Sequence, residues 1–223
     1  MKIQLEHITK TFKNTTAVND LDLIIEDGEL VCLLGPSGCG KSTTLSMLAG
    51  LLEPTSGEVY FDGASMSGVE AEKRDIGMVF QNYALYPHMT VEENIMFPLK
   101  MRWVPKTERK RRVKSIAEMM QITDLLSRKP GQLSGGQQQR VAIGRALIMR
   151  PALVLADEPT GNLDSRSSRD VMDLLCKASC HYQQTVLMIT HNMNLTLSAD
   201  RVFQVKDGEL EELGNVGKGA SPL

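Results

Sequence analysis

This sequence of 223 residues has no long apolar run, little excess of charge of either sign, and only four cysteines. No stretch approaches the roughly 20 apolar residues that a membrane-spanning helix requires, and residues 1–6 lack the apolar core of a secretory signal. The formal net charge of −2 excludes a general attraction to nucleic acid or anionic lipid. With 42% apolar residues, the composition is that of an ordinary globular protein. Any connection with a membrane is therefore expected to come through a partner.

The cysteines exclude a common type of metal site. They are Cys32, Cys39, Cys176 and Cys180, and no two of them have the CxxC spacing. Cys176 and Cys180 lie one helical turn apart, so a redox or metal pair is an alternative for them. Because no histidine stands between them at ligand spacing, free thiols of a cytosolic protein are the favoured interpretation.

A phosphate-binding loop is the first strong motif that the sequence does contain. Residues 35–42 read Gly-Pro-Ser-Gly-Cys-Gly-Lys-Ser and fit the pattern G-x-x-x-x-G-K-[ST], between a strand expected at 29–34 and a helix expected after Lys41. The glycines let backbone N–H groups approach phosphate oxygens, and the helix N-terminus adds partial positive charge. Lys41 is expected to reach the β- and γ-phosphates, and the hydroxyl of Ser42 to bind Mg²⁺. The expected phosphate-binding residues are Ser37, Gly38, Cys39, Gly40, Lys41, Ser42 and Thr43.

Two acids close an apolar strand further along the chain. Residues 153–156 are apolar and are followed by Asp157 and Glu158. Carboxylates beside an apolar strand are costly unless a cation or water meets them. Asp157 is expected to hold Mg²⁺ beside the P-loop, and Glu158 to activate water. His191 follows a second apolar strand and could reach the γ-phosphate and the attacking water, although in isolation an inert turn histidine is the favoured interpretation.

A second glycine-rich turn, Leu133-Ser134-Gly135-Gly136-Gln137, opens another expected helix. It is a further place where backbone N–H groups could face an anion. Since it cannot itself serve as the P-loop, it indicates that the nucleotide is closed over by a partner surface.

The alternation of strands and helices predicts an α/β fold with a mostly parallel sheet covered on both faces. Asp27-Gly28 gives a hairpin signal between strands expected at 21–25 and 29–34. The expected division is a catalytic core at about 1–81 and 151–212, a helical insertion at about 82–150, and a flexible tail at 213–223. Further elements are expected at residues 3–6, 57–61, 75–80, 135–149, 165–181 and 185–190, with a closing hairpin about Asp207-Gly208.

These motifs, in their order and spacing, resemble the ABC-type ATPases, the nucleotide-binding subunits of ABC transporters. The likeness covers roughly residues 1–212 and is carried by Lys41, Gln81, Leu133–Gln137, Asp157-Glu158, Asn162-Leu163-Asp164 and His191. It implies a P-loop NTPase core with an N-terminal antiparallel β subdomain and an inserted α-helical subdomain.

The resemblance also implies roles for individual residues. Ser134, Gly135, Gly136 and Gln137 would grip the γ-phosphate of ATP held by a second ATPase subunit. Gln81 would contact Mg²⁺ and the water, Glu158 would be the general base, His191 the switch histidine and Asp164 the D-loop aspartate. Phe12 falls on the position that stacks on adenine, with Val18 beside it.

The implied function is that of an ATP-hydrolysing subunit, using ATP and Mg²⁺, that drives an integral membrane permease from the inner face of the cell membrane. A homodimer or a pair of related subunits is expected, and no nucleic-acid partner. Residues 78–99 resemble the ATPases of sugar and polyamine importers, whereas residues 157–165 resemble those of lipoprotein release and macrolide efflux. The short length, without the regulatory β-domain usual in those importers, favours the second group. The alternative is an ABC ATPase that drives a membrane signalling or cell-division complex without transport.

Two further features have structural interpretations. The basic run at 106–114 suggests the solvated face of an amphipathic helix, with contact to lipid headgroups as the alternative. Met89, Met96 and Met101 fall near the expected docking groove for the membrane partner, although ordinary core filling is favoured for them.

Overall fold

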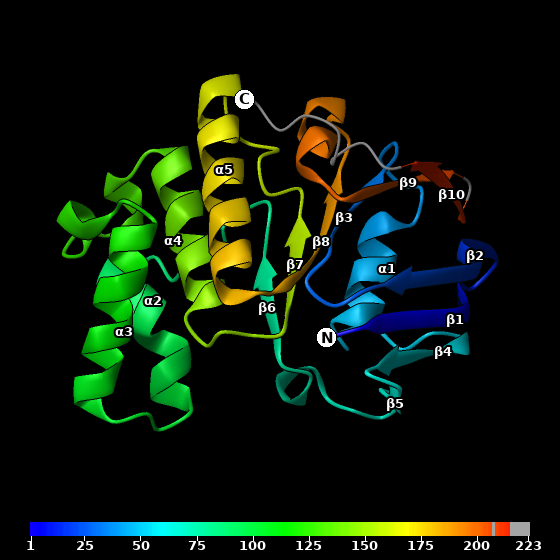
Figure 1. Cartoon of the computed structure of the whole chain (residues 1–223), viewed down its shortest axis with the longest axis horizontal. Helices are drawn as coiled ribbons and strands as arrows, with labels where there is room; N and C mark the ends of the chain where they lie inside the picture. The colour runs from blue at the N-terminus through cyan, green and yellow to red at the C-terminus, as the bar shows by residue number, and fades with distance from the viewer. Residues whose placement is uncertain (207, 215–223) are drawn as a thin grey trace.

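Two sheets and a layer of helices make up residues 1–206 and 208–214, the part of the chain that the computed structural model describes (Figure 1). The first sheet is antiparallel, with strand order β2-β1-β4-β5. In β2 the side chains of Leu21, Leu23 and Ile25 are buried and alternate with exposed ones, so one face of this sheet packs inward. Its strands are β1 (Ile3–Phe12), β2 (Thr15–Ile25), β4 (Ser56–Phe61) and β5 (Ala64–Ser65).

The second sheet has the order β10-β9-β3-β8-β7-β6, and only β10 runs antiparallel to its neighbour. Every residue of β3 and β8 is buried, as expected of central parallel strands covered on both faces. The sheet consists of β3 (Leu30–Leu34), β6 (Ile76–Val79), β7 (Leu153–Asp157), β8 (Thr185–Thr190), β9 (Arg201–Lys206) and β10 (Glu209–Gly214). The expected α/β class, with a mostly parallel sheet and an antiparallel β subdomain, is confirmed.

The hairpin expected at Asp27-Gly28 is wrong. A tight turn is present, since the N–H of Glu29 donates to the carbonyl of Glu26 over 3.2 Å. The turn carries the chain from β2 in the first sheet to β3 in the second, where β3 pairs with β8 and β9. The all-apolar β3 needs cover on both faces, which pairing with the half-exposed β2 would not give it.

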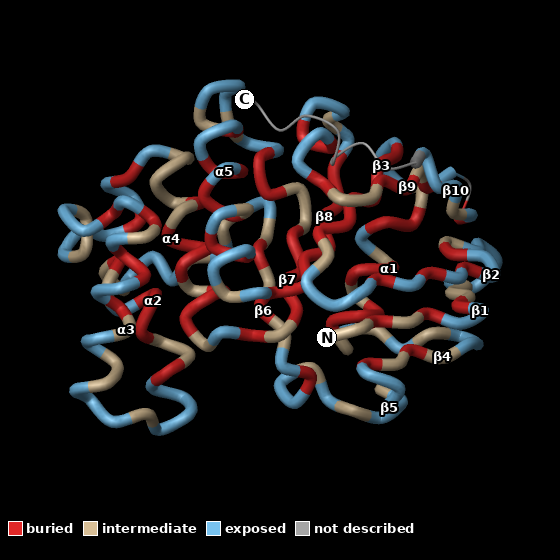
Figure 2. Tube along the Cα trace, viewed as in Figure 1, coloured by how far each residue is buried: buried red, intermediate tan, exposed pale blue. Residues whose placement is uncertain are grey.

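Helices and the first sheet cover the two faces of the second sheet. Val31 and Leu33 of β3 point into a buried cluster that contains residues of α1 and of the antiparallel sheet. Cys32 and Leu34 point into a second cluster, built with residues of α2 to α5. Figure 2 shows the buried strands between exposed outer surfaces. The helices are α1 (Lys41–Leu48), α2 (Val91–Met101), α3 (Lys106–Met119), α4 (Gly135–Leu147) and α5 (Ser165–Tyr182), with 3₁₀ turns at Ala71–Lys73, Thr123–Leu125, Pro130–Gln132 and Met193–Ser198.

The basic run forms most of α3, and its apolar side is buried as expected. Val113, Ile116 and Ala117 lie in the core, whereas Lys106, Lys110, Arg111 and Lys114 are exposed and Arg109 and Arg112 are partly buried. Met96 is also a core residue, only 8% exposed, whereas Met101 is 59% exposed. Among the described residues, no helix is both long and apolar enough to cross a bilayer. Of the expected tail, Leu213 and Gly214 belong to β10, and residues 215–223 lie outside the described part.

Candidate nucleotide site

The P-loop joins β3 to α1 at the carboxyl edge of the second sheet. Gly40 caps α1 with a φ of 103°, and a Cβ on it would lie 2.3 Å from the carbonyl oxygen of Ala17. Only glycine combines that left-handed conformation with that close approach. The N–H groups at the start of α1 are therefore presented to the space inside the loop, as a phosphate-binding turn requires.

Lys41 lies inside the loop that precedes it. The side chain is 5% exposed, and its ammonium donates to the carbonyl oxygens of Gly35 over 2.7 Å and Pro36 over 2.8 Å. A buried ammonium needs such acceptors, because its desolvation is costly otherwise. The loop thus holds one full positive charge at the point where the helix N-terminus adds its partial charge.

Ser42 and Asp157 bring the P-loop and β7 together. The Ser42 hydroxyl donates to Oδ1 of Asp157 over 3.4 Å. Burial, and next the charge of Glu158, raise the pKa of Asp157 above its ordinary value, which marks a half-buried carboxylate short of positive charge. A hydroxyl and a carboxylate are hard oxygen donors of the kind that Mg²⁺ prefers. The two residues fit a magnesium site.

Glu158 and His191 form a pair across the ends of β7 and β8. Nδ1 of His191 lies 2.6 Å from Oε2 of Glu158. Glu158 is 15% exposed at its side chain, has a φ of 46°, and donates its N–H to the carbonyl of Ile189 over 3.0 Å. The parallel pairing of β7 with β8 places the two residues at adjacent strand ends, as the sequence predicted. His191 is 60% exposed and so remains open to a ligand.

Gln81 follows β6 and lies against the loop between Glu158 and Asp164. The amide of Asn162 donates to its backbone carbonyl over 3.0 Å. A Cβ on Gly161 would come within 2.8 Å of the Gln81 Nε2, so the two segments touch. The glycine at 161 allows this close packing.

The second glycine-rich turn begins α4, as predicted, but it faces elements other than the P-loop. Ser134 caps the helix: its Oγ accepts the N–H of Gln137, and the side chain of Gln137 accepts the N–H of Ser134 over 3.0 Å. A Cβ on Gly135 would meet Tyr83 and Leu163, and one on Gly136 would meet Ser167. Within the described residues, no hydrogen bond links residues 134–137 to residues 37–43.

Asp164 is the N-cap of α5. Its Oδ1 accepts the N–H groups of Arg166 and Ser167, each over 3.0 Å, and its Oδ2 accepts the Ser167 hydroxyl over 2.7 Å. These bonds to Ser167 and Arg166 hold the pKa of Asp164 below its ordinary value. The segment that ends at Asp164 is thereby fixed at the start of α5.

Phe12 and Val18 lie on the paired strands β1 and β2, and Val18 contacts the P-loop. Phe12 is 47% exposed, with the Lys10 ammonium 5.4 Å from its ring centroid, so the ring can accept a stacked base. Val18 is 1% exposed and packs beneath the loop, where a Cβ on Gly40 would come within 3.3 Å of it. Its surroundings suit it to shaping the P-loop.

Two residues of α4 that the sequence reasoning missed connect this helix to the site. The Gln139 amide donates to the carbonyl of Pro159 over 2.6 Å. Arg145 donates to the carbonyls of Ala84 and Tyr83 over 2.7 and 3.2 Å, and both of those residues have a positive φ. The only sequence signal was for Arg145, a basic residue in the last turn of a helix. The bonds themselves could not be predicted, because they join segments far apart in the chain.

A P-loop beside a strand that ends in two carboxylates defines a P-loop nucleotide-binding protein. The chain belongs to the ABC transporter family, which matches residues 18–161. Its relatives include the xylose/arabinose import ATP-binding protein XacJ of Haloferax volcanii, 49% identical over 96% of this chain and 56% of that one. The trehalose/maltose import ATP-binding protein MalK of Thermococcus litoralis is 44% identical over 96% of this chain and 59% of that one. The chain thus spans less than two thirds of the length of these relatives.

Solved structures support the same family and fold. A dimeric post-hydrolysis state of the ATP-binding cassette MJ0796, bound to ADP and Pi, has a TM-score of 0.85 and 38% identity. The match covers 96% of this chain and 99% of that one. The resemblance to the ABC ATPases is confirmed.

Proposed function

We propose that the chain is an ATP-hydrolysing subunit of a membrane ABC transporter. The observation that carries the proposal is the Glu158–His191 pair at 2.6 Å, next to the Ser42–Asp157 bond at the mouth of the P-loop. A carboxylate, an imidazole and a hard-oxygen cation site meet at one edge of the sheet. That set suits water attack on a bound phosphoryl group.

Phosphate binding is assigned to the P-loop. Residues 37–43 would surround the β- and γ-phosphates with N–H groups, while Lys41 supplies the full charge. Phosphate oxygens would replace the carbonyls of Gly35 and Pro36 as partners of the ammonium. Phe12 would stack on the adenine, with Val18 beneath.

Glu158 is assigned as the general base. It would accept a proton from the attacking water, and His191 would orient the carboxylate and reach the γ-phosphate. Gln81 would hold the water from the opposite segment, against Gly161. Mg²⁺, held by Ser42, Asp157 and Gln81, would neutralise charge on the phosphate oxygens.

Residues 134–137 and Asp164 are assigned to the site of a second subunit. They cap α4 and α5 within this chain and have no bond to its own P-loop among the described residues. The MJ0796 cassette, which shares this fold, is a dimer in its post-hydrolysis state. In a head-to-tail pair, Ser134 and the amides of Gly135 and Gly136 would close over ATP bound to the partner and exclude water.

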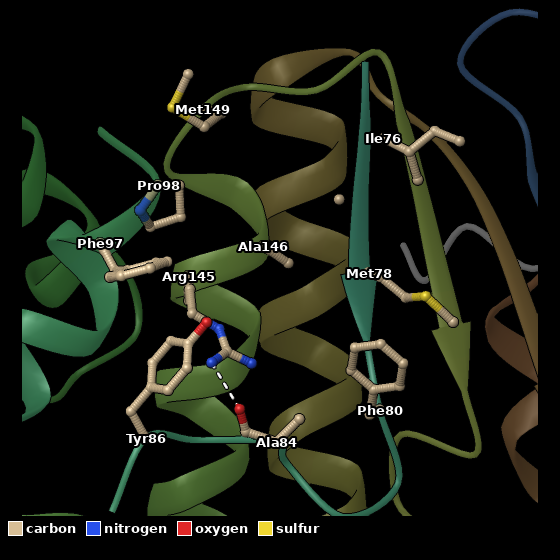
Figure 3. Close-up of a pocket in the computed structure, with 11 residues that line it drawn as sticks. Ile76, Met78, Phe80, Ala84, Tyr86, Phe97, Pro98, Arg145, Ala146 and Met149 are labelled. Atoms are coloured by element: carbon tan, nitrogen blue, oxygen red, sulfur yellow. Dashed lines mark hydrogen bonds between the residues drawn. The ribbon is translucent and has the colours of Figure 1, made fainter. Parts of the chain in front are cut away.

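A groove between β6, α2 and α4 is assigned to the membrane permease (Figure 3). It has a volume of about 350 Å³ and is lined by Phe80, Tyr86 and Phe97 around Arg145. Met149 also lines the groove, whereas Met96, for which the sequence favoured core filling, is buried in the core. Arg145 joins the groove, through Ala84, to the segment that follows Gln81, as the dashed line shows, so a partner seated there can bias Gln81.

The relatives favour an importer over the lipoprotein-release and macrolide-efflux group. The preference for that group rested on residues 157–165 and on chain length, and the length does not discriminate because the importer relatives are matched over little more than half their own length. The identities of 49% and 44% to import subunits support import. The subunit would then sit on the inner face of the cell membrane, with its core at about 1–81 and 151–212 and its helical insertion at about 82–150.

The test is phosphate release by Glu158→Gln with Mg²⁺ and ATP. We expect turnover at least about 100-fold below the parent, because general-base catalysis contributes 10²–10⁴-fold, and an ATP-dependent dimer in gel filtration. Glu70→Gln is the matched control, since Glu70 is exposed and pairs with the equally exposed Lys73. Turnover within threefold of the parent would show that Glu158 is not the base. A trapped dimer whose γ-phosphate contacts one polypeptide alone would exclude the shared site.

A further inference from the structure

The loop between α2 and α3 presents the chain's only tryptophan to solvent. Trp103 is 89% exposed and Met101, two residues earlier, is 59% exposed. The loop is well formed: the N–H groups of Trp103 and Val104 donate back into the end of α2, each over 3.1 Å. Arg102 donates to the carbonyl of Glu72 over 3.1 Å. Large apolar side chains held rigidly in solvent usually mark a contact site.

Four exposed cations on and beside the loop form no ion pair among the described residues. Within residues 1–206 and 208–214, no carboxylate lies within 4.0 Å of the exposed cations Lys100, Arg102, Lys106 and Lys110. The acid in the first turn of α3, Glu108, is held by Arg111 and Arg112, each at 2.7 Å. These two arginines lower the pKa of Glu108 to about 2, so its charge is present and already neutralised. The tip therefore carries a local positive excess that the net charge of −2 conceals.

The position of the tip relates it to the membrane. A second cavity, lined by Met101 and Arg102, shares Ile76, Pro98 and Met149 with the groove assigned to the permease. The tip thus continues the face that would approach the membrane, a step that rests on the proposed function. Figure 1 shows α2 and α3 running side by side to this loop, and Figure 2 colours most of the loop as exposed.

We propose that this tip, Met101 and Trp103 with Lys100, Arg102, Lys106 and Lys110, binds the anionic lipid headgroups of the membrane around the permease. Tryptophan favours the headgroup level of a bilayer, and lysine and arginine near the surface are attracted to anionic lipid. An acidic protein surface could also pair with these cations, but it would need an apolar pocket for the indole of Trp103 as well. Such contacts would add to the docking of the permease without inserting a helix.

The test uses the full chain and the intrinsic fluorescence of Trp103. Vesicles of phosphatidylglycerol and phosphatidylcholine should shift the emission to shorter wavelength and carry the protein into the pellet on sedimentation. Vesicles of pure phosphatidylcholine should do neither. Since the attraction is electrostatic, about 0.5 M salt should weaken it. Because the chain has a single tryptophan, the emission reports on this loop alone.

Lys110→Glu should lower vesicle partitioning about tenfold or more, because the reversal removes one attraction and adds one repulsion. Lys177→Glu is the matched control: Lys177 is an exposed helical lysine on α5, away from the tip. Without vesicles, both variants should have the ATPase turnover of the parent. A chain that lacks ATPase activity would therefore contradict the proposed function without bearing on lipid binding. Equal binding to both vesicle types, no blue shift, or equal loss in Lys177→Glu overturns the proposal. So does a Trp103→Ala chain that loses only its co-purification with the membrane protein, since that result assigns the tip to a protein contact.

Discussion

The side-chain amide of Gln139 donates to the backbone carbonyl of Pro159 over 2.6 Å. Gln139 lies in α4, two residues after the glycine-rich turn ends, and Pro159 directly follows Glu158. The amide is fully buried, so the bond is shielded from water. It ties α4, close to its glycine-rich start, to the residue that follows Glu158.

Replacing Gln139 with methionine should therefore slow catalysis more than it weakens binding. The substitution keeps length and volume but leaves the Pro159 carbonyl without its donor. We expect kcat to fall about tenfold with KM for ATP nearly unchanged, together with about 1 kcal/mol of lost stability. Steady-state phosphate release and urea unfolding measure the two effects.

Gln184→Met is the control for that substitution. Gln184 is also buried, and its amide donates to the carbonyl of Pro151 over 2.6 Å, remote from Glu158. It should lose the same stability with kcat unchanged. Equal losses of kcat in both variants would reduce the role of Gln139 to ordinary packing.

Arg74 should contribute to stability through the end of α1. Arg74 as a whole residue is 4% exposed. Its guanidinium donates to four backbone carbonyls at 2.9 to 3.1 Å, those of Met47, Leu48, Met66 and Val69. Arg74→Met removes these four bonds, of which, among the described residues, only those to Met47 and Met66 leave a carbonyl that still accepts a backbone N–H, and should lower the free energy of unfolding by about 2–4 kcal/mol. Lys73→Met removes only an exposed pair with Glu70 and should cost less than about 1 kcal/mol. Denaturant unfolding compares them, and similar losses would contradict the capping role.

Asp157→Asn should stabilise the protein at neutral pH while abolishing its magnesium-dependent turnover. The pKa of Asp157 is raised by burial and by Glu158, so the folded chain holds this proton more tightly than the unfolded chain. The resulting stabilisation is fully present below the unfolded pKa and is lost as pH rises through the folded pKa. Asparagine, which stays neutral, should therefore raise Tm at pH 7–8 without Mg²⁺.

That gain should shrink as the pH falls toward 4, where the parent carboxyl takes up its proton. Added Mg²⁺ should stabilise the parent but not the variant, because ligand binding to the folded state adds to its stability. Asp124→Asn, at an exposed turn position, is the control and should leave Tm unchanged. A lower Tm for Asp157→Asn at pH 7–8 would contradict the argument.

The sequence predicted those parts of the site that adjacent residues build. The P-loop needs only residues 35–42 and the flanking strand and helix, and β7 and β8 carry Asp157 and His191 to neighbouring strand ends. Bonds between distant segments could not be predicted in this way. The side chain of Gln139 donates to a residue 20 positions away in the chain, and that of Arg145 to one 61 positions away. No local pattern encodes such a contact.

The wrong hairpin at Asp27-Gly28 has the same origin. A turn dipeptide fixes the local reversal of the chain, but it does not determine which strand becomes the neighbour. Burial on both faces of β3 outweighed the local signal and placed that strand between β8 and β9. The sequence of β3, apolar at nearly every position, was the stronger indication.

In the cap of α4, the Oγ of Ser134 acts as an acceptor for the N–H of Gln137. A hydroxyl retains its own proton for donation while its lone pairs are engaged. An arriving anion can thus be received without unwinding the first turn of α4, and the speed of subunit association would depend on diffusion and orientation rather than on local refolding.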